Sequence, residues 1–300
     1  MSENVKPKIG FIGLGLMGSA MVKRLQDLEY PLTVIAHRNR KPIDEAVARG
    51  AVEVATPADV AKNSDIVMLC VDTTAAVESV MQGDNGVISQ LQKEALVIDF
   101  GTSIPASTRL LAEQCQAKGA SMIDAPLGRT PAQAVDGLLN IMSAGNKSDF
   151  DKAKPVLDDL GENVFHVGPT GAGHTLKLIN NFFGMTTACA MSEAFAMADL
   201  AGIERKTLYE VLSSGPLKSG MMEMIKFGAV DNEPEKMAFS VGNALKDLGY
   251  YSNMADDFKV PSLMSPAVKN VLGLASVSGF GEKMVPELVN YIAGLFSDKK

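Results

Sequence analysis

A glycine-rich turn near the N-terminus constrains the fold of this chain more than any other feature. Residues 8–15, KIGFIGLG, form a short apolar run typical of a buried strand, and this run leads into GLGLMG at residues 13–18. A helical pattern follows over residues 19–28. A strand, a tight glycine turn and a helix in this order are typical of the start of an α/β sheet.

Short apolar runs then alternate with helical patterns through the first half of the chain. The runs predict strands at residues 32–38, 65–71, 95–100, 121–126 and 139–145, and helices are predicted at 43–49, 76–81 and 106–118. Continuous apolar strands separated by helices favour a parallel sheet covered on both faces. We therefore expect a doubly wound, Rossmann-type α/β domain over residues 1–165.

The second half of the chain is predicted to be helical. Residues 171–202 form one long helical stretch, apolar around much of its circumference, which implies burial by other helices or by a second subunit. Further helices are predicted at residues 206–213, 238–257, 262–274 and 284–296. We expect an all-α domain over residues 166–300, joined to the first by the long helix.

Composition excludes several classes of function. The 300 residues carry a formal net charge of −7 with no basic run, which disfavours nucleic-acid binding, and an anionic substrate would need a local cationic site. The three cysteines, Cys70, Cys115 and Cys189, lie too far apart for zinc-ligand spacing or a disulfide framework, and no metal site is predicted. No signal peptide or apolar run of about 18 residues is present, so a cytoplasmic protein without a membrane span is expected.

The glycine-rich turn predicts a dinucleotide cofactor. Its glycines have G-x-G-x-x-G spacing, in which Gly13 permits a tight turn, Gly15 lets a pyrophosphate approach the backbone and Gly18 allows close packing of helix on strand. The helix N-terminus would supply N–H donors and a positive dipole end. The alternative is a glycine turn that only packs. The predicted cofactor contacts here are Gly13, Leu14, Gly15, Leu16, Met17 and Gly18.

The end of the second predicted strand indicates which dinucleotide binds. An acidic residue about 20 positions beyond the motif would hold the ribose of NAD, but residues 32–43 contain none. They contain His37, Arg38, Arg40 and Lys41 instead, and a basic cluster suits the 2′-phosphate of NADP. We expect NADP, with NAD possible; the alternative is a solvated basic turn. His37 and Arg38 are the predicted contacts.

The long helix contains a candidate acid–base group. Lys177 and Asn181 stand four residues apart in GAGHTLKLINN and so share one helix face. An ammonium in a partly dry cleft can have its pKa lowered into a useful range for proton transfer, but a lysine among apolar residues can also extend to solvent. His174 lies one turn earlier and is either a second acid–base candidate or a polar neighbour.

Four segments together resemble the β-hydroxyacid dehydrogenase family over nearly the whole length. IGFIGLGLMGSAM is similar to its cofactor signature, DAPLGRTPAQAVDGLLNIMSAG to its substrate loop, GAGHTLKLINN to its catalytic segment and KDLGYYSNMA to its C-terminal segment. The resemblance implies a Rossmann domain plus a helical domain, and a homodimer or homotetramer.

The resemblance also implies residue roles. Lys177 would protonate the carbonyl oxygen as hydride arrives, and an ammonium there would also stabilise a developing alkoxide. Asn181 would help to hold the substrate, and Thr102 would lie near both nicotinamide and substrate. The remaining implied cofactor contacts are Val71, Phe239 and Lys246, with Asp247 beside them.

The chain departs from the family pattern in its substrate loop. Many members have Ser-Gly-Gly where this chain has Gly128, Arg129 and Thr130, so the usual serine that grips a substrate carboxylate is absent. Gly128 is expected to allow an unusual backbone that lets Arg129 lean into the site, where its guanidinium can bind a carboxylate or sulfonate with two hydrogen bonds. The alternative is an arginine that points to water.

These features predict an NADPH-dependent reductase of a small acidic aldehyde to a 3-hydroxy acid or its sulfonate analogue. Similar Gly-Arg-Thr loops occur in sulfolactaldehyde reductases, which makes a sulfonated aldehyde a candidate substrate. The alternatives are an NAD-dependent dehydrogenase of the 3-hydroxyisobutyrate type and, in another class, a non-catalytic nucleotide-binding interaction protein.

Overall fold

A computed structural model describes residues 6–37 and 39–297. The chain divides into two compact units, Met1–Lys177 and Leu178–Lys300. No helix among the described residues is long and apolar enough to cross a membrane.

The first unit contains a parallel six-stranded sheet. Its strands are β1 (Ile9–Ile12), β2 (Leu32–Ile35), β3 (Val52–Val54), β4 (Ile66–Leu69), β5 (Leu96–Asp99) and β6 (Ser121–Asp124), in the order β3-β2-β1-β4-β5-β6. Each neighbouring pair is parallel, which confirms the predicted doubly wound sheet. The strand order reverses between β1 and β4, and ligands of such sheets bind beyond the carboxyl ends of the strands at that point.

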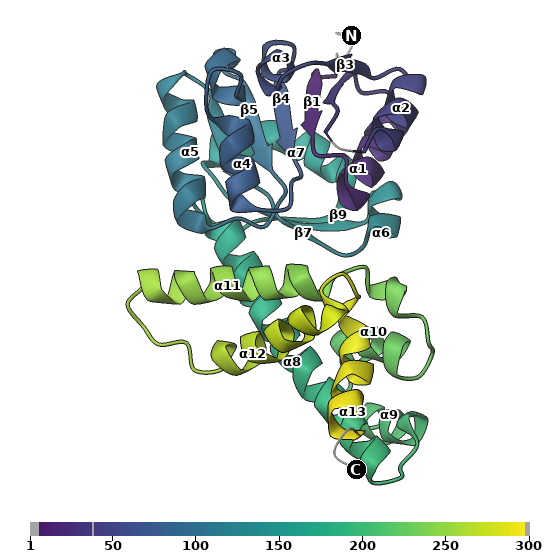
Figure 1. Cartoon of the computed structure of the whole chain (residues 1–300). Coiled ribbons are helices and arrows are strands. Elements are labelled where there is room, and N and C mark those ends of the chain that lie inside the picture. The colour runs from purple at the N-terminus through teal and green to yellow at the C-terminus, as the bar shows by residue number, and fades with distance from the viewer. Residues whose placement is uncertain (1–5, 38, 298–300) are drawn as a thin grey trace. The chain divides into compact units, whose positions relative to one another are not determined.

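Helices cover both faces of this sheet (Figure 1). They are α1 (Leu16–Asp27), α2 (Lys41–Ala48), α3 (Pro57–Lys62), α4 (Thr74–Met81) and α5 (Pro105–Ala117), with a short 3-10 turn at Val87–Gln90. Side chains alternate along β1: Phe11 belongs to the same apolar core as Met21 of α1, whereas Ile12 belongs to a second core with Val77 of α4. Both faces are therefore buried, as the continuous apolar strands predicted.

A second, three-stranded sheet completes the first unit. It consists of β7 (Leu127–Gly128), β8 (Leu139–Ser143) and β9 (Gly161–His166), with α6 (Pro131–Val135) and α7 (Lys147–Leu160) between them. β7 pairs antiparallel with β8, and β8 pairs parallel with β9. The strand predicted at 139–145 thus lies outside the parallel sheet, because the chain reverses direction after β7.

The second unit is built from helices. Most of α8 (Ala172–Leu200) belongs to it, together with α9 (Arg205–Ser213), α10 (Gly220–Ala229), α11 (Val241–Asp257), α12 (Ser265–Ala275), α13 (Leu288–Ser297) and short turns at Pro234–Met237, Ser276–Phe280 and Val285–Glu287. Phe195 of α8, Leu248 of α11 and Leu288 of α13 share one buried core. Phe183 of α8 is 73% exposed, and the expected homodimer or homotetramer stays a prediction.

Candidate active site

The three glycines of the turn after β1 have distinct steric surroundings. Gly13 has φ +101°, and a Cβ there would lie 2.3 Å from the carbonyl oxygen of Cys70. A Cβ on Gly18 would lie 1.9 Å from the carbonyl oxygen of Gly13, whereas a Cβ on Gly15 would meet no atom within 4 Å. Gly13 and Gly18 are therefore required by the fold itself, and Gly15 leaves open space beside the backbone.

The N-terminus of α1 fits an anionic group. The helix begins at Leu16 with Gly15 as its N-cap, and it has neither a side-chain cap nor an acidic residue in its first turn. The first N–H groups of a helix have no partner within the helix and lie at the positive end of its dipole. The open space at Gly15 beside these donors fits the pyrophosphate of a dinucleotide. Leu14 and Met17 pack against the core, while Leu16 is 75% exposed.

Three turns meet at the carboxyl edge of the sheet. A Cβ on Gly13 would lie 2.9 Å from the side chain of Val71, which follows β4, and a Cβ on Gly101, after β5, would lie 3.0 Å from the carbonyl oxygen of Val71. The turns after β1, β4 and β5 are thus packed side by side. Thr102, half-buried, lies in the third of these turns. This is the edge at which the strand order predicts a dinucleotide.

The basic cluster after β2 is partly neutralised. The two Nη atoms of Arg40 lie 2.6 Å from Glu53 and 2.8 Å from Asp44, and Lys41 Nζ lies 4.0 Å from Glu45. The hydrogen bond with Glu53 raises the pKa of Arg40, and the same bond holds the pKa of Glu53 below its usual value. The NADP prediction therefore rests on His37, which is exposed, and on Arg38, which lies outside the described residues.

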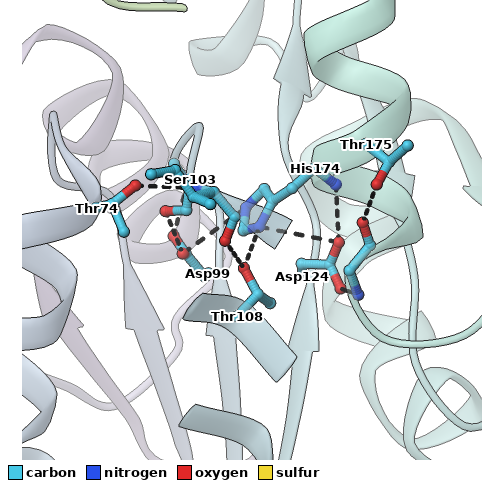
Figure 2. Close-up of polar contacts among 10 residues, drawn as sticks. Thr74, Asp99, Ser103, Thr108, Asp124, His174 and Thr175 are labelled. Carbon is cyan, nitrogen blue, oxygen red and sulfur yellow. Dashed lines mark hydrogen bonds and ion pairs between the residues drawn. The ribbon is translucent and has the colours of Figure 1, made fainter. Parts of the chain in front are cut away.

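Asp124 fixes the start of α8 on the sheet (Figure 2). Its Oδ1 accepts the backbone N–H of Gly171 at 2.7 Å, and its Oδ2 accepts that of His174 at 2.8 Å. His174 has no exposed surface, and its Nδ1 lies 2.8 Å from Thr108 Oγ1. Such burial does not suit a residue that exchanges protons with a bound substrate. Lys177, half-buried, is one helical turn farther along α8.

The substrate loop differs from the sequence-based expectation in its backbone. Arg129, not Gly128, takes the positive φ, at +80°. The expectation for Gly128 was wrong because this residue is paired in β7, where a Cβ would lie 3.3 Å from Asn140 Cβ. Arg129 Nη1 contacts Glu162 Oε2 at 2.5 Å and donates to the Leu138 carbonyl at 2.6 Å. Thr130 donates from its N–H and its hydroxyl to Gln133 Oε1 at the start of α6.

A second polar group lies within the helical unit. Asn181 Nδ2 donates to Asp247 Oδ2 at 2.7 Å, and Lys246 Nζ lies 3.2 Å from Asp247 Oδ1. Asn181 and Asp247 are buried, so the carboxylate is compensated by an amide and an ammonium. Phe239 packs against the core of this unit, and its carbonyl oxygen accepts the N–H of Val285.

Sequence reasoning missed the buried polar residues behind these turns. Asp99, Thr108 and Asp124 are 0%, 1% and 0% exposed. A signal for two of them was present, because Asp99 and Asp124 end apolar strands, where an acid is not needed for packing.

Comparison with known proteins places these features in one family. Residues 8–168 match the family described as the NAD binding domain of 6-phosphogluconate dehydrogenase, and residues 171–292 match that described as NAD-binding of NADP-dependent 3-hydroxyisobutyrate dehydrogenase. The chain is 31% identical to 3-sulfolactaldehyde reductase of Escherichia coli K12, over 97% of this chain and 99% of that protein. It is 30% identical to 2-(hydroxymethyl)glutarate dehydrogenase of Eubacterium barkeri, over 92% and 91% of the two chains.

A solved structure supports the same family assignment. The crystal structure of 3-hydroxyisobutyrate dehydrogenase from Salmonella typhimurium superposes with a TM-score of 0.82 at 26% identity, covering 95% of this chain and 99% of that one. With a glycine turn that fits a pyrophosphate and relatives that match along almost its full length, the chain belongs to the β-hydroxyacid dehydrogenase family and is an NAD(P)-dependent oxidoreductase.

Proposed function

We propose that this enzyme reduces a small aldehyde bearing a carboxylate or sulfonate to the corresponding hydroxy acid, with NADPH as the favoured cofactor. The bound nicotinamide supplies the hydride. Similarity to a 3-sulfolactaldehyde reductase supports a sulfonated aldehyde as one candidate, at 31% identity.

The position of Arg129 is the observation that carries this proposal. Its Nη1 is bound to Glu162 and Leu138, but the edge formed by Nε and Nη2 has no partner in the part of the chain that the structure describes. That edge carries N–H donors in the geometry that binds a carboxylate or sulfonate through two hydrogen bonds. The positive φ of Arg129 is costly for a residue with a side chain, and such backbone is concentrated at ligand sites.

Lys177 is the proposed proton donor. A half-buried ammonium can stabilise negative charge on the carbonyl oxygen and then give it a proton. The other predicted contacts stay part of the proposal: Thr102, Gly128, Thr130 and Asn181 toward the substrate, and Val71, Phe239 and Lys246 toward the cofactor.

The test compares Arg129→Ala with wild type on one anionic and one neutral aldehyde of similar size. Loss of a paired charge-assisted contact of about 2 kcal/mol raises KM for the anionic aldehyde about thirtyfold and leaves the neutral one unchanged. Arg129→Lys should restore only part, because an ammonium lacks the planar fork. Arg49→Ala is the matched control, because it also removes an arginine that is ion-paired in the first unit. Equal losses on both aldehydes would mean that Arg129 only shapes its loop.

A second candidate is an NAD-dependent dehydrogenase of the 3-hydroxyisobutyrate type. The pairing of Arg40 with Glu53 and Asp44 favours it, because these acids reduce the positive charge available to a 2′-phosphate. Calorimetric titration with NADH and NADPH separates the two candidates: tighter binding of NADH would support the second.

A further inference from the structure

We infer that a buried polar cluster, made of Asp99, Ser103, Thr108, Asp124 and His174, positions the two segments that bear Thr102 and Lys177. Asp99 and Asp124 end β5 and β6, and Ser103 lies in the turn after β5 (Figure 2). Thr108 belongs to α5, and His174 to the first turn of α8. The roles of Thr102 and Lys177 rest on the proposed function, whereas the cluster itself stands on contacts within the first unit.

Asp124 acts as a cap for α8 supplied from a distant part of the chain. It lies 47 and 50 residues before the two N–H groups that it accepts, those of Gly171 and His174. The carboxylate is fully buried, so these charge-assisted bonds and the helix dipole must compensate its charge. The start of α8 is thereby tied to the end of β6.

Asp99 holds the turn after β5 in place by accepting two hydrogen bonds from it. Its Oδ1 accepts the N–H of Gly101 at 2.8 Å, and its Oδ2 accepts the hydroxyl of Ser103 at 3.0 Å. The two bonds lie on either side of Thr102 and fix the turn that contains it. Asp99, like Asp124, has no exposed surface.

His174 links the two carboxylates. Its Nδ1 lies 2.8 Å from Thr108 Oγ1 and 4.0 Å from Asp124 Oδ2, and its Nε2 lies 3.7 Å from Asp99 Oδ2. Nε2 is buried and makes no hydrogen bond with any described residue. The Thr108 hydroxyl also donates to the Ile104 carbonyl oxygen at 3.3 Å, so Thr108 joins the ring to the start of α5, while Nε2 faces the Asp99 carboxylate. The imidazole thus bridges the β5 turn and α8.

The backbone of the first turn of α8 packs closely against Asp124 and β8. A Cβ on Gly173 would lie 2.3 Å from the Met142 carbonyl oxygen and 2.8 Å from Asp124 Oδ2. Lys177 follows His174 by three residues, about one helical turn, so its backbone position depends on how that turn is seated. A shift of about 1 Å in a reacting group can lower a catalytic rate about a hundredfold, which is why such seating matters.

The test uses Asp124→Asn, whose amide offers one acceptor oxygen where the carboxylate offers two. One of the two N–H groups then loses its acceptor, so amide hydrogen exchange of residues 171–177 should accelerate at least tenfold. We expect kcat for aldehyde reduction to fall at least tenfold, and the deuterium isotope effect on kcat, measured with labelled NADPH, to rise. The dissociation constant of NADPH, whose pyrophosphate is predicted to bind at the turn after β1, should stay within about twofold. Ser121→Ala, which removes a bond to Asp149 at the other end of β6, is the control and should change none of these quantities.

Normal kcat per folded molecule and an unchanged isotope effect, despite faster exchange, would show that the cluster only stabilises the fold and would overturn the inference. Unchanged exchange in residues 171–177 would overturn it as well. If Asp124→Asn does not fold, Thr108→Val is the second variant: it removes the contact to Nδ1 and a 3.3 Å bond to the Ile104 carbonyl at the start of α5, and it should change exchange and kcat in the same direction by about threefold. If wild type reduces no aldehyde, the proposed function fails, and the exchange measurement still tests the cluster.

Discussion

Two alanine substitutions in the glycine turn should separate folding from cofactor binding. In Gly18→Ala the new Cβ would lie 1.9 Å from the Gly13 carbonyl oxygen, so α1 must move away from the turn. Overpacking of this kind lowers the free energy of unfolding by about 1–3 kcal/mol. The higher helix propensity of alanine raises it by less than about 1 kcal/mol. A net loss of about 2 kcal/mol corresponds to a melting temperature lower by about 4–8 °C in a unit of this size.

Gly15→Ala should leave the stability of the fold nearly unchanged and weaken cofactor binding. Its Cβ would meet no atom within 4 Å, and its φ of −73° suits alanine, so the melting temperature should change by no more than about 3 °C. The methyl group would occupy the space predicted for the pyrophosphate. Loss of one charge-assisted hydrogen bond of about 1.5–3 kcal/mol raises the dissociation constant of the cofactor at least tenfold.

The assay pairs a thermal melt with a calorimetric titration of NADPH for both variants and wild type. Each variant serves as the control for the other, because both add one methyl group to the same turn. Wild-type affinity in Gly15→Ala would refute the placement of the pyrophosphate, and a wild-type melt of Gly18→Ala would refute the packing argument.

Three further predictions concern chemistry, cofactor choice and thiols. Lys177→Ala should lower kcat about 10²–10⁴-fold with the NADPH dissociation constant unchanged, and retention of more than about a tenth of the activity would contradict its role. Arg38→Ala should weaken NADPH binding about tenfold or more and leave NADH binding nearly unchanged in calorimetry, because the lost bond to a 2′-phosphate contributes about 1.5–3 kcal/mol. Burial raises the pKa of Cys70, Cys115 and Cys189 to about 12, so a thiol titration near neutral pH should find none in the native protein and three after unfolding. Because the unfolded thiols ionise near 9.0 and the native ones do not, the free energy of unfolding should fall as the pH rises above that value, which urea titrations at several pH values would measure.

Sequence patterns predicted the parallel sheet because local signals and tertiary structure agree there. The run 8–15 is apolar since β1 is buried on both faces, and Gly18 is required by a contact with Gly13, only five residues away. The long helix was predicted at 171–202 and found at Ala172–Leu200. These features depend on short-range spacing, which a sequence displays directly.

What the sequence did not reveal depends on contacts between distant segments. The run 139–145 has the pattern of a parallel strand, but its partners β7 and β9 place it in another sheet. β9 and α7 were not predicted, and the short exposed strand β3 gave no apolar signal. The bond from Asp124 to His174 spans 50 residues, and the pair between Arg129 and Glu162 joins a loop to β9. No local pattern encodes such pairs.

Steady-state reduction of an aldehyde panel by the wild-type enzyme tests the central claim most directly. The panel holds a sulfonated, a carboxylated and a neutral aldehyde of similar size, each assayed with NADPH and NADH. We predict turnover of the anionic aldehydes with kcat/KM at least tenfold above that of the neutral one, and a higher kcat/KM with NADPH than with NADH. Equal kcat/KM for neutral and anionic aldehydes, or no oxidation of either cofactor, would contradict the account.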